Sequence, residues 1–182
     1  EDWIFPISRR QHVYVAAFDG NGQRFADLFA KTWKALPLSA RRRILGHWHR
    51  PHPFVPATRL PMSPTIQLTA SWSGRDLGDH PLAGTWAAVS NNGHHMHFFS
   101  RIVEELPDSH VCELVAHELA HVVQHAWLWR RDYDKDGNPI DVDQQGNVMT
   151  ALEIEDDADE LMADWGFEPE AMVGWAIEQG IV

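Results

Sequence analysis

Two histidines four residues apart, with a glutamate directly after the first, are the side chains in this sequence best suited to chemistry. The segment is His117-Glu118-Leu119-Ala120-His121. On a helix, residues four apart lie on one face, one turn apart, so both imidazoles can reach a single ion. In the H-E-x-x-H arrangement the histidines bind zinc and the glutamate acts on the water that zinc activates. We therefore expect His117 and His121 as Zn²⁺ ligands and Glu118 as a general base.

The third ligand has to come from another segment. A catalytic zinc takes three protein ligands and leaves one position for water. His125 is eight residues beyond His117, about 12 Å along a helix axis, so one ion cannot bind both. The metzincin pattern also fails, because Trp127 occupies the position of its third histidine.

The segment 151–165 combines an apolar stripe with many carboxylates. Glu155 and Asp159 lie beside the stripe, one turn apart. A carboxylate there can reach a metal on a neighbouring helix, and a second can accept a hydrogen bond from the other ring nitrogen of a ligating histidine. The expected stripe consists of Ala151, Ile154, Ala158, Leu161 and Trp165. The competing carboxylates are Glu153, Asp156 and Asp157.

With these residues the sequence resembles the gluzincins, the thermolysin-like zinc peptidases, whose third ligand is a glutamate followed four residues later by an aspartate. Glu155 and Asp159 meet that spacing, and Glu155-x-x-Ala158-Asp159 resembles the E-x-x-A-D pattern of small gluzincin-like domains. Compact SprT-like and ImmA/IrrE-like proteins have a similar order of a strand followed by the HExxH helix. The resemblance covers residues 85–125 and 151–166. It implies Glu155 as the third ligand and Asp159 as the partner that orients a ligating histidine.

The resemblance also implies a function. The expected protein is a zinc-dependent metallopeptidase that hydrolyses peptide bonds in a peptide or protein substrate. The alternative is a zincin-like binding or sensing domain that holds zinc with little or latent proteolytic activity. Candidates for stabilising an oxyanion are Tyr133, His94, His95 and His97. Residues 94–99 resemble the edge strand with which such enzymes hold an extended peptide.

Alternating aspartates indicate a second candidate metal site. Asp132, Asp134 and Asp136 precede Gly137, as at the start of a calcium loop. The twelfth position is Asp143, however, and not the glutamate that closes such a loop. The other interpretation is an acidic β-hairpin inserted between the two metal-site helices. We expect a Ca²⁺ ion here only if the segment forms a calcium loop.

The net charge of −11 is unevenly distributed. Residues 1–101 carry 12 Lys or Arg and 6 Asp or Glu, whereas residues 102–182 carry 3 and 20. The acidic half argues against a nucleic-acid partner, and the arginines at 41–43 are interpreted as a solvated helix face. No apolar run approaches the ~20 residues of a membrane-spanning helix, so no membrane partner is expected. The single cysteine, Cys112, is typical of a reducing compartment, and we expect a cytoplasmic protein in which Cys112 is a small buried residue.

Hydrophobic periodicity and turn residues predict the helices and strands that carry these residues. Helices are predicted at residues 23–36, 40–48, 101–106, 108–129, 151–165 and 169–179. Strands are predicted at 11–18, 65–72, 85–89 and 94–99, the last two joined by an Asn-Gly turn. Residues 49–64 and 74–84 are interpreted as loops. The expected fold is α+β and zincin-like: one domain over 1–182, with a helical part at 1–64. Residues 65–182 then form a small, mostly antiparallel sheet, the HExxH helix and a C-terminal glutamate helix.

Overall fold

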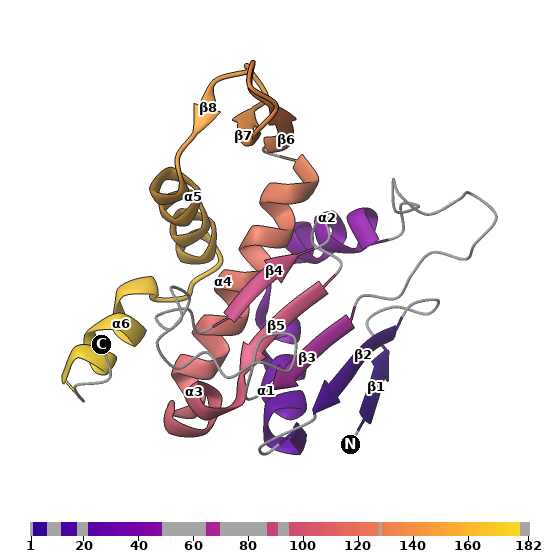
Figure 1. Cartoon of the computed structure of the whole chain (residues 1–182). Coiled ribbons are helices and arrows are strands. Elements are labelled where there is room, and N and C mark those ends of the chain that lie inside the picture. The colour runs from indigo at the N-terminus through magenta and orange to yellow at the C-terminus, as the bar shows by residue number, and fades with distance from the viewer. Residues whose placement is uncertain are drawn as a thin grey trace.

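The computed structural model describes residues 2–6, 12–17, 22–48, 65–69, 87–90, 95–127 and 129–178. The expected α+β class is confirmed (Figure 1). The predicted loops at 49–64 and 74–84 and the hairpin turn at 91–93 lie outside the described residues. The elements are β1 (Asp2–Pro6), β2 (His12–Ala17), α1 (Gly22–Ala35), α2 (Leu38–Trp48), β3 (Thr65–Thr69), β4 (Ala87–Ser90), β5 (His95–Phe99), α3 (Ser100–Glu105), α4 (Asp108–Trp127), β6 (Trp129–Tyr133), β7 (Pro139–Asp143), β8 (Val148–Met149), α5 (Ala151–Asp164) and α6 (Pro169–Glu178).

The larger sheet has five strands in the order β1-β2-β3-β5-β4. β2 pairs with β3 and β3 with β5 in parallel, whereas the β1–β2 and β4–β5 pairs are antiparallel. The expectation of a mostly antiparallel sheet is therefore wrong for this sheet. Parallel neighbours need a long crossover connection, and the segment with α1 and α2 supplies it between β2 and β3. β1 is an additional strand that the sequence pattern does not predict.

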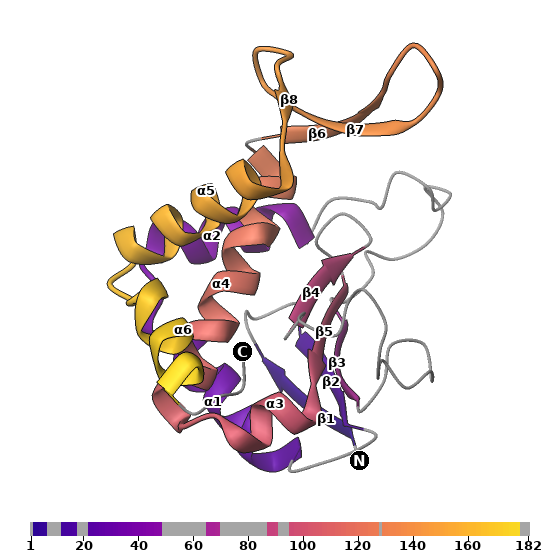
Figure 2. The same cartoon turned by 60° about the vertical axis from the view of Figure 1, so that its left-hand side comes forward.

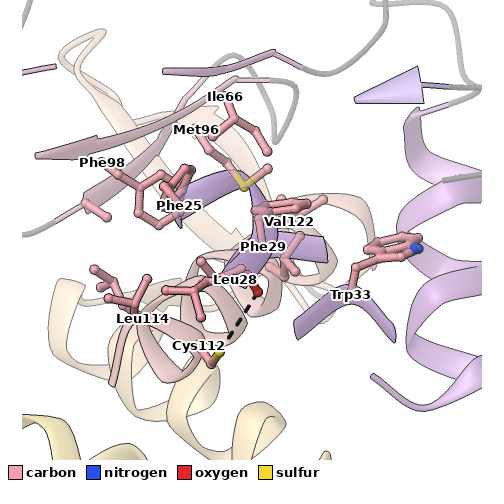
Figure 3. Close-up of a cluster of buried hydrophobic side chains, with 14 of the residues drawn as sticks. Phe25, Leu28, Phe29, Trp33, Ile66, Met96, Phe98, Cys112, Leu114 and Val122 are labelled. Atoms are coloured by element: carbon pink, nitrogen blue, oxygen red, sulfur yellow. Dashed lines mark hydrogen bonds between the residues drawn. The ribbon is translucent and has the colours of Figure 1, made fainter. Parts of the chain in front are cut away.

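The helices lie on one side of this sheet, and the main core fills the space between the two layers (Figure 2). Met96 and Phe98 of β5 point into the core, while the alternating His95 and His97 are only half-buried. Figure 3 shows the contact of this strand with α1, where the ring centroids of Phe25 and Phe98 are 4.8 Å apart. Because strand side chains alternate between faces, the two histidines point away from the helices.

Helix α4 runs through the middle of this core, with its apolar residues almost completely buried. The core side chains that α4 supplies are Val111, Leu114, Val115, Leu119, Val122 and Val123. Cys112 is a small buried residue, as expected, and its Sγ lies 3.9 Å from the Leu28 carbonyl oxygen. Burial of this kind stabilises the fold by roughly 25 cal/mol per Å² of apolar area. Helix α4 is therefore fixed by packing along most of its length.

Arg24 of α1 holds the corner between α3 and α4. Its guanidinium donates to the carbonyl oxygens of Val103 and Leu106, at 2.5 and 2.7 Å, and to the Asp108 carboxylate at 2.9 Å. The C-terminal carbonyl groups of a short helix lack partners within the helix, and a cation is favourable there. This interaction fixes the start of α4 against α1.

A smaller antiparallel sheet, β6-β7-β8, connects the end of α4 to the start of α5 and projects from the body (Figure 2). Its two turns follow the same sequence pattern, Asp-x-x-Gly-Asn, beginning at Asp134 and at Asp143. Each turn has its glycine at positive φ, 82° at Gly137 and 90° at Gly146. Glycine adopts this left-handed conformation without the steric cost that other residues incur.

Helix α5 has well-defined ends. Thr150 is its N-cap, and Thr150 and Glu153 form a reciprocal capping box. At the other end Gly166, with φ 88°, allows the chain to leave the helix. The apolar stripe differs from the predicted one at two positions: Ala151 is exposed, and Met162 is buried.

Candidate metal centre

Three ligand-type atoms from α4 and α5 converge on one point. His117 Nε2 lies 3.0 Å from His121 Nε2 and 3.0 Å from Glu155 Oε2. His121 Nε2 lies 3.5 Å from the same Glu155 oxygen. In a tetrahedral zinc site with bonds of ~2.0–2.1 Å, ligand atoms are about 3.3 Å apart. The three distances therefore match the spacing that such an ion requires.

Two helices that pack side by side create this convergence (Figure 2). On α4 the imidazoles of His117 and His121 are one turn apart, with ring centroids at 4.7 Å and planes at 87°. The capping box at Thr150 fixes the start of α5, which places Glu155 and Asp159 on successive turns. Helical spacing on both sides thus brings residues 34 or more positions apart in sequence into one site.

Asp159 contacts the ring nitrogen of His117 that points away from the convergence. His117 Nδ1 lies 2.9 Å from Asp159 Oδ1. Since an ionised carboxylate only accepts hydrogen bonds, Nδ1 is the donor. A neutral ring then carries its lone pair on Nε2, which is the atom that faces His121 and Glu155. This is the arrangement in which an outer carboxylate orients a ligating imidazole.

Glu118 is buried beside the two histidines. Its side chain is 4% exposed, and its ligand atom lies within 4.8 Å of those of His117 and His121. Its Oε2 is buried and has no hydrogen-bond partner among the described residues. Burial raises the pKa of Glu118, and the charges of His121 and His117 partly offset that rise. A buried carboxylate oxygen without a partner is costly, and this one adjoins the point of convergence.

The charges around the site favour a cation at its centre. Burial alone lowers the pKa of His117, but hydrogen bonds with Asp159 and Glu155 and the charge of Glu118 outweigh it and raise that pKa to about 10. Hydrogen bonds with His117 and His121 in turn lower the pKa of Glu155. Two imidazoles and a carboxylate also form a donor set typical of zinc. The residues present therefore fit a divalent metal ion.

Gln124 is a site residue that the sequence analysis did not identify. It is fully buried on α4. Its amide oxygen lies 2.6 Å from His121 Nδ1, and its amide nitrogen donates to the Ile154 carbonyl oxygen at 2.6 Å. The available signal was a glutamine in an apolar run, one turn beyond His121, where a buried polar side chain needs specific partners.

The competing carboxylates have other positions. Glu153 accepts hydrogen bonds from the backbone N–H and hydroxyl of Thr150, so the capping box occupies it. Asp156 is exposed on α5. Among the described residues, His117, Glu118 and His121 form a mutually close group of ligand-type side chains, and Glu155 reaches both histidines of that group from α5. His125 is outside that group.

The candidate calcium loop forms the turn of a β-hairpin. Asp132 belongs to β6, and the chain turns at Asp134 to return as β7. The Asp134 carboxylate accepts hydrogen bonds from the backbone N–H groups of Asp136 and Asn138 and from the Asn138 amide. Its oxygens are therefore used within the turn. Asp132, Asp134 and Asp136 form no metal-binding group in the part of the chain that the structure describes.

The candidate oxyanion and peptide-binding residues are also placed by the fold. Strand β5 lies between β3 and β4, so the expected edge position of residues 94–99 is wrong; among the described strands, β4 is the edge strand on this side of the sheet. His95 and His97 contact each other on β5, with ring centroids 4.2 Å apart. Tyr133 is 67% exposed at the end of β6. His94 is outside the described residues.

Comparison of the chain with protein-family models, with curated proteins and with solved structures finds no match. Within the described residues, no helix has the length and apolar character needed to cross a membrane. The geometry of the site is therefore the basis for assigning a function.

Proposed function

We propose that this protein is a zinc-dependent metallopeptidase whose ion is held by His117, His121 and Glu155. The observation that carries the proposal is the triangle of Nε2, Nε2 and Oε2 atoms at 3.0, 3.0 and 3.5 Å. Glu155 is assigned as the ligand because its oxygen completes that triangle. Glu118 remains free for proton transfer, which agrees with the gluzincin-like order of residues in the sequence.

Glu118 is suited to act as the general base. A zinc ion held by His117, His121 and Glu155 would polarise a carbonyl oxygen and lower the pKa of a bound water molecule to about 7. The carboxylate of Glu118 would take the proton from that water during its attack and would return the proton to the leaving amine nitrogen. Its burial raises its pKa towards the working pH, which improves both transfers. Asp159 keeps His117 oriented throughout.

The edge strand β4 supports a peptide as the substrate. β4 ends the five-stranded sheet and packs beside α4, the helix that carries the histidines. An edge strand offers backbone N–H and C=O groups to an added strand, so an extended peptide can bind there by strand addition. We expected this role of residues 94–99. Because β5 lies between β3 and β4, the proposal now concerns β4.

The test combines metal analysis with one substitution. Purified protein should contain one zinc per chain by elemental analysis. Glu118→Gln should retain that zinc and the fold, yet lose about 10²–10⁴-fold in cleavage rate on a peptide found by library digestion. The amide fills the same space but cannot accept the proton. Glu160→Gln, which removes an exposed carboxylate from α5, is the control and should cleave at the wild-type rate.

Two outcomes would contradict the proposal. Cleavage by Glu118→Gln at the wild-type rate would exclude this carboxylate as the base. A wild-type protein that carries full zinc but cleaves nothing in a broad peptide library would favour the alternative, a zinc-holding domain that binds or senses.

A further inference from the structure

The Gln124 side chain lies in the apolar core, where an amide is costly unless both of its ends are bonded. One end faces the carbonyl oxygen of Ile154 at 2.6 Å. A carbonyl can only accept a hydrogen bond, so the amide nitrogen has to be on that side. The orientation of this amide is therefore determined by the backbone of α5.

The other end of the amide then determines the state of His121. With the nitrogen directed at Ile154, the oxygen of Gln124 faces His121 Nδ1 at 2.6 Å. That oxygen can only accept, so Nδ1 carries the proton. In the neutral ring Nε2 is then bare, and Nε2 is the atom at 3.0 Å from His117 Nε2. A ring with the opposite tautomer would present an N–H to the metal position.

We propose that Gln124 is a positioning residue that sets the tautomer and orientation of His121, and that it does so through its bond to α5. The inference rests on the proposed metal role of His121. The ring of His117 is oriented in the same way by a direct hydrogen bond from its Nδ1 to Asp159 of α5. Packing of α5 against α4 therefore orients both candidate histidine ligands, and the same helix also supplies the third candidate ligand, Glu155.

A second buried polar residue in the core, Thr32, forms a hydrogen bond that does not involve a candidate ligand, so it can serve as a control for Gln124. Thr32 is also almost fully buried, and its hydroxyl donates to the Cys112 carbonyl oxygen at 3.4 Å. That bond joins α1 to the backbone of α4 and includes no metal-site ring. Thr32→Val is thus a matched control: it removes a buried hydrogen bond from the core but none from the His121 ring.

The experiment compares Gln124→Met and Gln124→Glu with Thr32→Val in the full chain. Gln124→Met keeps the volume and removes both hydrogen bonds. Gln124→Glu keeps an acceptor for His121 Nδ1–H and removes the donor to Ile154. Zinc affinity is measured by competition with a chromophoric chelator. The His121 tautomer is read from the ¹⁵N shifts of the imidazole in metal-free protein at alkaline pH, where the ring is neutral. Alkaline pH is needed because, although burial lowers the pKa of His121, the hydrogen bond with Glu155 and the charge of Glu118 raise it. This reading requires neither zinc nor a substrate.

Gln124→Met should bind zinc about 10–100-fold more weakly, and its metal-free His121 should show mixed tautomers. Gln124→Glu should keep the Nδ1–H tautomer and recover most of the affinity, while amide exchange at the start of α5 becomes faster. Thr32→Val should leave zinc affinity and the tautomer unchanged.

An unchanged tautomer and unchanged zinc affinity in Gln124→Met would overturn the inference. If that variant fails to fold, mixed tautomers in Gln124→Glu would do the same. Absence of zinc binding in the wild type would reject the proposed function. The role of Gln124 would still be tested, because the tautomer of His121 is measured in metal-free protein.

Discussion

At the candidate metal centre, each histidine presents one nitrogen to the other residues of the triangle and uses its second nitrogen to bind a polar partner. His117 uses the Asp159 carboxylate and His121 uses the Gln124 amide, at 2.9 and 2.6 Å. The two partners differ in charge. A carboxylate makes the ring a stronger electron donor than an amide does, so we expect His117 to be the more basic ligand of the pair.

Asp159→Asn should lower zinc affinity by about 10–100-fold while the fold is retained. The amide of asparagine can still accept from His117 Nδ1–H, but it lacks the negative charge that strengthens the ring as a ligand. Competition titration with a chelator measures the effect. Asp156→Asn, which removes the same charge from an exposed position on α5, is the control. Equal affinities for the two variants would show that Asp159 does not act through His117.

At the scale of single elements, two glycines near the C-terminus should respond to alanine in opposite ways. Gly166 follows α5 with φ 88°, and Gly174 lies inside α6 without positive φ; a Cβ at either position meets nothing within 4 Å. Gly166→Ala should lose about 1–2 kcal/mol of unfolding free energy from backbone strain. Gly174→Ala should gain about 0.5–1 kcal/mol, because glycine is unfavourable inside a helix.

Urea unfolding of both variants measures these changes. Since neither Cβ meets a neighbouring atom, the comparison isolates backbone conformation from packing. Destabilisation by Gly174→Ala would show that the described path of α6 is wrong at that residue. A Gly166→Ala variant with an unchanged unfolding free energy would show that the end of α5 does not require a positive φ at residue 166.

Several elements could be predicted from the sequence because their signals are local. The spacing of His117 and His121 inside an apolar run is sufficient to predict α4, and the end of α5 was expected at Gly166. Strand pairing is different, because the side-chain pattern of β3 or β5 is the same whether its neighbour runs parallel or antiparallel. The mixed sheet therefore became visible only in three dimensions, where the crossovers are fixed.

The same division applies to the candidate site. His117, Glu118 and His121 follow from one helix, so they could be proposed from spacing alone. Gln124 could not, because its decisive partner is a backbone carbonyl of another helix, which no side-chain pattern records. Glu155 and Asp159 were chosen by resemblance among several carboxylates, and their roles in metal binding remain predictions.

At the scale of the whole molecule, stability should fall as the pH decreases from about 6.5 towards 4. Burial, and then the charge of His95, lower the pKa of His97 to about 4; burial also lowers that of His95. Between those pH values the unfolded chain binds protons that the folded chain does not, so acid favours unfolding. The unfolding free energy of metal-free protein at pH 6.5 and pH 5 tests this, because above pH 6.5 the raised pKa of His117 has the opposite effect on stability. His97→Gln should show a smaller decrease than the wild type; an equal decrease would exclude His97 as a contributor.

Removal of the metal should destabilise the whole chain. An ion that binds only the folded state adds RT ln(1 + [L]/Kd), about 4 kcal/mol when free zinc is 1,000 times Kd. Excess chelator should therefore lower the Tm of the wild type. His121→Ala should have a Tm that does not respond to the chelator, because it lacks one donor of the triangle. A chelator-sensitive His121→Ala would place the stabilising metal elsewhere.

The projecting sheet β6-β7-β8 keeps the Glu155 carboxylate close to the two candidate histidine ligands. It is the covalent tether between α4 and α5, so the carboxylate of Glu155 is never free to diffuse away from the two imidazoles. Even a short flexible tether gives an effective concentration of about millimolar, and an ordered one whose span matches the gap gives more. If the site binds a metal ion as proposed, the last bond to it would be a chelate ring closure, made without the translational entropy that an independent carboxylate would lose. Lengthening this tether should weaken the chelate gradually, since loop-closure entropy depends only logarithmically on length.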